Sequence, residues 1–88
     1  MDVDELNTKI SQYKEAAQAG DLESQIKLGE CYQEKADYQH AAKWLEKAAR
    51  QKGRSIPYNF GSCYLMGVGV EQDYSEAVRW FKKALDKK

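Results

Sequence analysis

The two halves of this sequence resemble each other. Residues 28–32 (LGECY) match residues 60–64 (FGSCY), and residues 37–44 (DYQHAAKW) match residues 73–80 (DYSEAVRW). The segment between the matched blocks is longer in the second copy, and its added residues fall at Gly67-Val68-Gly69-Val70, where glycine permits a longer turn. Apolar residues recur with a period of about 3.6 before each block, and such repeats are typical of stacked helix-turn-helix units. The sequence therefore predicts an all-α fold.

Five helices are predicted, in a single domain of 88 residues. They are expected at about 3–19, 22–35, 38–52, 56–66 and 74–87. Asp2 with Glu5 and Asp73 with Glu76 have the spacing of a capping box, and Ser55 is the expected cap of the fourth helix. The first helix carries one apolar stripe, made of Val3, Leu6, Ile10, Tyr13 and Ala17. We divide the domain into an N-terminal helix at 1–19, a first repeat at 20–53 and a second repeat at 54–88.

Two glycines, Gly29 and Gly61, fall in the middle of predicted helices. Glycine costs about 1 kcal/mol relative to alanine there, so we expect each to permit the close approach of a neighbouring backbone, with Ala41 and Ala77 of the next helix facing them. Large side chains would fill the space around these contacts. They are Tyr32, Tyr38, Trp44 and Leu45 in the first copy and Tyr64, Tyr74, Trp80 and Phe81 in the second.

The composition is that of a folded protein without a strong electrostatic field. Hydrophobic residues make up 42% of the chain and the formal net charge is zero, which excludes a disordered chain. Long-range attraction to nucleic acid or an anionic membrane is also not expected. The N-terminus lacks the features of a secretory signal, and no apolar run approaches membrane-spanning length. We expect a soluble protein of the cytoplasm or another reducing intracellular compartment.

The sequence contains no pattern typical of catalysis, of a metal site or of a cofactor site. Cys31 and Cys63 are too far apart in sequence for a zinc or redox motif. They occupy equivalent positions on two helices whose axes should lie about 8 to 10 Å apart, so we predict buried thiols and no disulfide. His40 is the single histidine, and Gly67-x-Gly69 lacks the third glycine of a phosphate-binding loop. We therefore expect no enzyme, no metal and no cofactor.

The repeat resembles a known family. Residues 28–53 contain the pattern L-G-x-x-Y followed by D-Y-x-x-A-x-x-W-x-x-K-A-A-x-x-x-G, which is similar to the Sel-one-like repeat (SLR), a relative of the tetratricopeptide repeat (TPR). Residues 61–84 also keep the G-x-G-V loop that distinguishes this family, whereas residues 34–36 of the first copy lack it. The resemblance implies a short right-handed α-solenoid of about two repeats plus an N-terminal helix. It also implies an adaptor or scaffold that binds a protein or peptide, with motif residues that pack and do not catalyse.

In such solenoids the first helices of successive units line a concave face. By this resemblance, the partner-binding positions of the first copy are Glu23, Ile26, Glu30, Gln33 and Glu34. Those of the second copy are Ser55, Tyr58, Ser62, Leu65 and Met66. The first set is acidic and the second is uncharged and partly apolar, so the groove would favour a segment with a basic and an apolar residue. The alternative is that Tyr58 and Leu65 complete the core against the second helix and that the glutamates form a solvated surface.

Two further surfaces give alternative functions. Val78, Phe81 and Leu85 lie on the last helix, where an uncapped end could bind another copy or join a larger solenoid as a structural subunit. Two basic stripes could bind nucleic acid on the convex face, although lysines late in a helix also favour the negative end of its dipole and keep a surface soluble. The stripes are Lys43, Lys47 and Arg50, and Arg79, Lys83 and Lys87.

Overall fold

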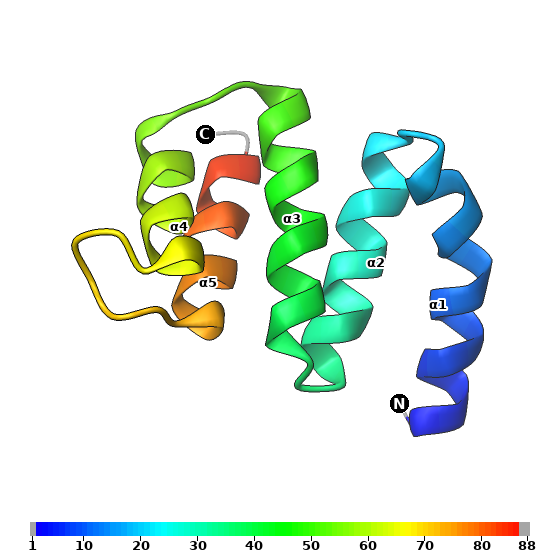
Figure 1. The fold of residues 1–88 in the computed structure, drawn as a ribbon. Helices are drawn as coiled ribbons and strands as arrows, with labels where there is room; N and C mark the ends of the chain where they lie inside the picture. The colour runs from blue at the N-terminus through cyan, green and yellow to red at the C-terminus, as the bar shows by residue number, and fades with distance from the viewer. Residues whose placement is uncertain (1, 87–88) are drawn as a thin grey trace.

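The computed structural model describes residues 2–86, which form five helices and contain no strand (Figure 1). The helices are α1 (Val3–Gln18), α2 (Leu22–Glu34), α3 (Tyr38–Lys52), α4 (Ile56–Met66) and α5 (Tyr74–Leu85). The all-α fold is confirmed, and α3 and α4 have their predicted bounds. The backbone is already extended at Asp86, so α5 ends at Leu85; residue 87, its predicted end, lies outside the described residues.

Each helix begins at a capping side chain. The caps are Asp2, Asp21, Asp37, Ser55 and Asp73, and each side chain accepts a hydrogen bond from a backbone N–H of the first turn. The hydroxyl of Ser24 and its backbone N–H both donate to the Asp21 carboxylate, and the hydroxyl bond contributes most to holding the pKa of that carboxyl below its usual value. The short polar residue before each apolar stripe thus fixes where the helix starts.

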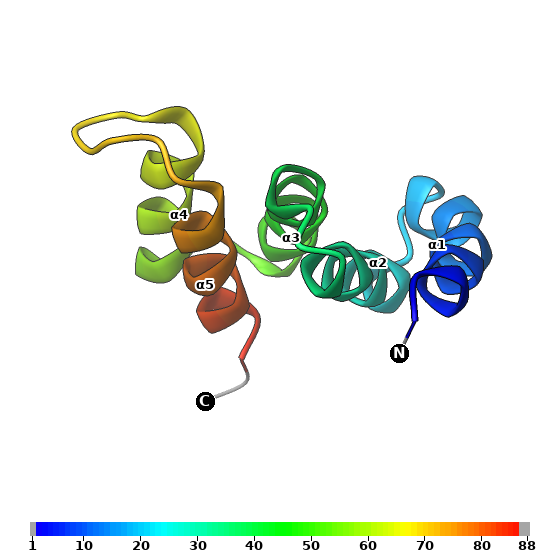
Figure 2. The same cartoon turned by 90° about the horizontal axis from the view of Figure 1, so that it is seen from below.

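The helices form a row in which each packs on its neighbours (Figures 1 and 2). α1 packs on α2 and α2 on α3, while α3 packs chiefly on α5, and α5 pairs with α4. One core cluster lies between α3, α4 and α5, around Leu45, Tyr58 and Phe81. A second lies between α1 and α2, around Leu6 and Leu28. Two side-by-side cores of this kind are what stacked helix pairs produce.

Both mid-helix glycines have close neighbours, but these are mainly side chains and not the backbone that was predicted. A Cβ atom at position 29 would lie 2.7 Å from Cγ of Leu45, while the carbonyl oxygen of Ala41 would be 3.4 Å away. A Cβ atom at position 61 would lie 2.7 Å from the ring of Phe81, which is nearer than any atom of Ala77. The repeat therefore places one large side chain against each glycine.

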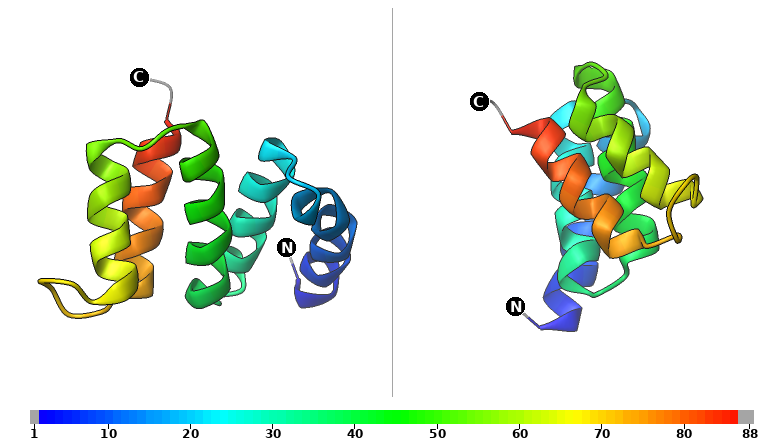
Figure 3. Two further views of the ribbon diagram at one scale, coloured as in Figure 1. Left: turned by 45° about the horizontal axis from the view of Figure 1, so that its top comes forward. Right: turned by 90° about the vertical axis from the view of Figure 1, so that its left-hand side faces the viewer.

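The two repeats do not stack in the same way. α1 packs on α2, the first helix of the first repeat. α3 would pack in the same way on α4, the first helix of the second repeat, but it packs chiefly on α5 and only lightly on α4. The expected contact between α2 and α4 is absent, because the two helices lie on opposite sides of α3 (Figures 1 and 3). Cys31 and Cys63 are both free thiols, but Cys63 is only half-buried, so the prediction that both are buried on adjacent helices is wrong in these two respects.

Candidate protein-binding surface

α2 and α5 lie on either side of α3 (Figure 2). Residues of these three helices line a hollow, with α2 and α5 as its walls and α3 as its floor. We call it the α2–α5 hollow. It consists of two adjoining depressions that share Glu30 and Lys82. Its lining residues are Ile26, Glu30, Gln33, Glu34, Tyr38, Leu45, Lys82, Leu85 and Asp86.

One end of the hollow is apolar. A depression of about 200 Å³ is bounded by Ile26 on one wall, Leu85 on the other and Leu45 on the floor. Ile26 and Leu85 are half-buried and Leu45 is fully buried, so the first two present apolar surface at the edges of a packed core. This end suits an apolar side chain of a partner.

The rest of the hollow is charged and mostly acidic. Glu30 and Glu34 project from α2, and Asp86 lies at the end of α5. Lys82 is the one cation among the lining residues, and its Nζ donates a hydrogen bond to Oε1 of Gln33 at 3.3 Å, which links the two walls. Three carboxylates against one ammonium favour a basic group on a partner.

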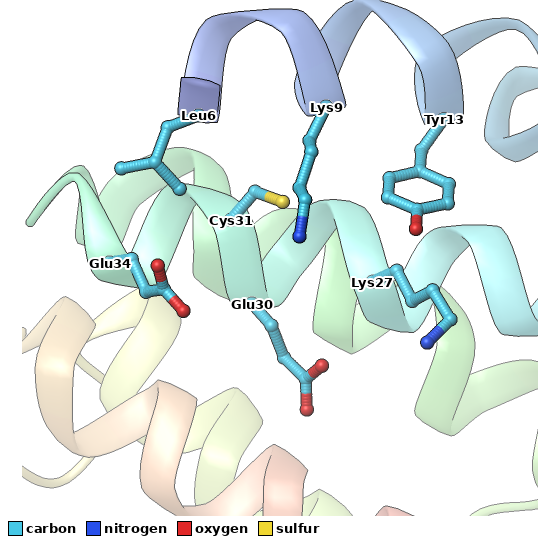
Figure 4. Close-up of a pocket in the computed structure, with 7 residues that line it drawn as sticks. All are labelled: Leu6, Lys9, Tyr13, Lys27, Glu30, Cys31 and Glu34. Carbon is cyan, nitrogen blue, oxygen red and sulfur yellow. The ribbon is translucent and has the colours of Figure 1, made fainter. Parts of the chain in front are cut away.

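A narrower cleft of about 120 Å³ separates α1 from α2 (Figure 4). Lys9 and Tyr13 extend into it from α1, and Cys31 points toward α1, whereas Glu30 and Glu34 point away from α1. Burial raises the pKa of the Cys31 thiol, the Glu34 carboxylate raises it further, and the Lys9 ammonium opposes them. The α2 glutamates therefore lie between this cleft and the α2–α5 hollow.

A family model described as the Sel1 repeat matches residues 22–53 and 58–88. The chain belongs to the Sel1 repeat family. Sel1 repeats are protein-protein interaction modules and are generally not enzymes.

Two curated relatives match most of this Sel1 repeat chain. "DAP3-binding cell death enhancer 1" of Rattus norvegicus is 32% identical over 77 residues, which are 85% of this chain and 15% of the relative. "ERAD-associated E3 ubiquitin-protein ligase component HRD3" of Candida glabrata is 29% identical over 77 residues, which are 88% of this chain and 9% of the relative. The chain thus spans a small part of the length of these relatives. No solved structure gave a significant match.

The structure places the predicted α2 site residues along the hollow, with one exception. Ile26, Glu30, Gln33 and Glu34 line it. Glu23 does not; its carboxylate lies 3.8 Å from the ammonium of Lys27 on the exposed side of the helix.

The predicted α4 site residues do not line the hollow. Ser62 and Leu65 are half-buried, Met66 is 70% exposed on another side of the molecule, and Tyr58 is buried. The hydroxyl of Tyr58 donates to Oε2 of Glu46 at 2.8 Å. Tyr58 and Leu65 thus complete a core, as in the alternative interpretation, but against α3 and α5 instead of α2. The structure does not bring the two predicted halves of the groove together, and binding at the α4 residues stays a prediction.

The second wall of the hollow was missed by sequence reasoning. Lys82, Leu85 and Asp86 supply it from α5. The signal that could have found them is the position of Lys82 and Leu85 beside the buried stripe of Val78 and Phe81. Because these last two are fully buried, the apolar residues expected at an uncapped end of α5 largely pack inside the molecule.

The basic stripes are interleaved with aromatic and acidic partners. Lys47 lies 5.0 Å from the ring centre of Trp44, and Lys83 lies 5.1 Å from that of Trp80. Arg50 pairs with Glu46, and Arg79 pairs with Glu76; Lys87 lies outside the described residues. Cations with partners in the same chain favour the solvated-surface interpretation over nucleic-acid binding.

No cluster of three or more histidine, cysteine, aspartate or glutamate side chains is arranged to hold a metal ion in residues 2–86. His40 is exposed, and its Nδ1 lies 2.8 Å from the carboxylate of Asp37 at the start of α3. None of the described helices is long and apolar enough to cross a membrane.

Proposed function

We propose that this chain is an adaptor that binds a segment of a partner protein in the α2–α5 hollow. The observation that carries the proposal is the pairing of an apolar end, formed by Ile26 and Leu85, with acidic walls that include Glu30 and Glu34. Sel1 repeats act as protein-protein interaction modules, and one relative is named for binding another protein. A concave surface of this composition is what such a module offers to a ligand.

The chemistry of the hollow describes the segment that would fit. An aliphatic side chain would enter the depression between Ile26 and Leu85, and a lysine or arginine of the same segment would lie against Glu30 and Glu34. The Lys82 ammonium donates a hydrogen bond to Gln33. It would donate a further hydrogen bond to a carboxylate or carbonyl oxygen of the segment. The proposed ligand is therefore a segment with an aliphatic residue and a basic residue a few positions apart.

The test compares two variants with the same change of charge. Glu30→Lys with Glu34→Lys reverses the acidic wall, while Glu15→Lys with Glu71→Lys reverses two exposed carboxylates outside the hollow. Each variant and the unaltered chain are used as bait in an extract of the source cells, and the captured proteins are identified by mass spectrometry. Partners that bind in the hollow are lost only from the first variant, and the affinity of a purified partner should fall about tenfold or more.

One control and one further measurement make the result decisive. Far-UV circular dichroism must show that both variants keep the helical content of the unaltered chain. If every captured protein binds the two variants equally well, the hollow is not the binding site. If a partner is lost, a peptide scan of that partner should identify a segment with an aliphatic and a basic residue, and a segment lacking either would contradict the proposed ligand class.

A further inference from the structure

The two repeats show the same surface in two states, one covered and one open. In the first repeat α1 covers Leu28 and Cys31 of α2, which are 0% and 7% exposed, and Trp44 packs against the same cluster. α1 achieves this with an amphipathic stripe, of which Leu6 and Ile10 are buried. This surface of a repeat is therefore one that a helix covers.

No helix packs on the equivalent face of the second repeat as α1 packs on α2. Phe60, Cys63 and Trp80 stand where Leu28, Cys31 and Trp44 stand in the first copy. Phe60 is 48% exposed, and none of the three belongs to either core cluster of the described residues. The rings of Trp80 and Phe60 are tilted by 32° with their centres 4.9 Å apart, and Lys83 lies over the Trp80 ring as Lys47 lies over Trp44. The surface is formed in the same way in both repeats, but only α2 has a helix on it.

The open surface is also less charged than the covered one. Lys27, Glu30 and Glu34 of α2 border the cleft between α1 and α2, with both glutamates pointing away from α1. The matching positions of α4 are Asn59, Ser62 and Met66. Ile56 replaces Ser24 as well, and Ile56 and Met66 are 71% and 70% exposed. We call this surface the Phe60 face; it consists of Ile56, Asn59, Phe60, Cys63, Met66 and Trp80.

We propose that the Phe60 face binds an amphipathic helix of a partner protein, in the manner in which α1 covers α2. Exposed apolar side chains gathered on one side of a helix mark an interaction site, and α4 is apolar on both sides, which is typical of a helix that is covered on both. The stripe of α1 gives the pattern of the partner: branched aliphatic residues at positions i and i+4 and an aromatic residue at i+7, as Leu6, Ile10 and Tyr13 are spaced.

The partner helix differs from α1 in its charge. α1 places Lys9 beside Glu30 and Glu34, but Ser62 and Met66 offer no charge at those positions, so the partner carries an uncharged residue there. An acidic residue at its edge would meet Lys83, which lies beside Trp80. A second copy of this chain does not supply such a helix, because the apolar stripe of its own α1 is already buried against α2.

The test uses the pattern of α1 as its probe. A fluorescein-labelled peptide of residues 2–19 with Lys9→Ala is held helical by a hydrocarbon staple on its polar side, because an unrestrained peptide of this length is marginally helical. Its binding to the unaltered chain is measured by fluorescence anisotropy. Ile56→Ser and Phe60→Ser remove apolar surface from the face, and each should weaken binding about tenfold. Val3→Ser is the matched control, since Val3 and Ile56 are both exposed β-branched residues that begin a helix, and it should leave binding unchanged.

A second readout places the peptide on the surface. In a Trp44→Phe background Trp80 is the only tryptophan, and its emission should shift to the blue when the peptide covers it. Three results would overturn the proposal. The first is no binding up to a peptide concentration of about 1 mM. The second is equal binding to Phe60→Ser, which would mean that the peptide had displaced α1. The third is sedimentation showing a dimer that Phe60→Ser dissociates, which would make the occupant a second copy.

Discussion

Gly29→Ala adds one methyl group at the closest contact between α2 and α3. The added Cβ would lie 2.7 Å from Cγ and 2.8 Å from Cδ2 of Leu45, well inside the favourable carbon-carbon separation of about 3.5 to 4.0 Å. Leu45 is fully buried, and because its Cγ clashes as well as its Cδ2, rotation of the end of the side chain alone does not relieve the contact. Overpacking of this kind costs about 1 to 3 kcal/mol, and the better helix propensity of alanine returns about 1 kcal/mol. We expect a net loss of stability of about 1 kcal/mol.

The same substitution should have the opposite sign when Leu45 is shortened. Leu45→Ala removes both atoms that the new Cβ would meet and by itself costs about 2 to 5 kcal/mol. In that background Gly29→Ala meets no side chain at this contact, so it should stabilise the chain by up to about 1 kcal/mol. The two effects of one methyl group thus differ by about 2 kcal/mol, which is the coupling free energy of the pair.

Urea unfolding of all four proteins, followed by far-UV circular dichroism, measures this coupling. A shift of the midpoint without a change in slope identifies a change in stability. If Gly29→Ala changes the free energy of unfolding equally in both backgrounds, the contact with Leu45 does not explain why glycine stands at this position. Stabilisation of the unaltered chain by Gly29→Ala would refute the packing argument outright.

Three further substitutions test other parts of the structure. Because hydrogen bonds lower the pKa of Asp21 in the folded chain, its stabilisation is present above about pH 4 and is lost on acidification; Asp21→Asn should therefore flatten the fall of the thermal midpoint between about pH 5 and 2. Cys63→Ser should leave only the buried Cys31, whose reaction with a thiol reagent should be much slower than that of the unaltered chain. Tyr58→Phe removes the hydrogen bond to Glu46 and should lower the free energy of unfolding by about 1 kcal/mol in a urea titration.

Local signals in the sequence were sufficient to predict the helices. Asp2, Ser55 and Asp73 accept backbone N–H groups at the starts of their helices, as predicted. Asp21 and Asp37 do the same at the starts of α2 and α3. The close contacts at Gly29 and Gly61 also follow from local reasoning, since glycine in the middle of a helix needs a compensating approach. These features depend on residues within a few positions of one another or on the repeat itself.

The relative placement of the two repeats could not be predicted, and α4 shows why. This helix carries apolar residues on two sides: Tyr58 and Leu65 lie on one side, and Ile56 and Phe60 lie on the other. A pattern with two apolar sides does not determine which side packs on α3. The structure uses the side of Tyr58, so that α5 lies opposite α2 and forms the second wall of the hollow. The prediction from the repeat assumed that α4 would lie next to α2, because uniform stacking places the first helices of successive repeats side by side.

The positions at which the two copies differ explain both proposed surfaces. Glu30 and Glu34 of the first copy give the hollow its acidic wall, and Ser62 and Met66 stand at the same positions in the second. Shared residues such as Gly29 and Gly61 maintain packing within each repeat, so they carry little information about partners. The residues that differ give the two repeats different surfaces. The first repeat presents the carboxylates of Glu30 and Glu34, and the second presents the apolar side chains of Ile56 and Met66. Charge reversal in the hollow and Phe60→Ser should each weaken binding of a different ligand and leave the other unaffected, because the two surfaces share no residue.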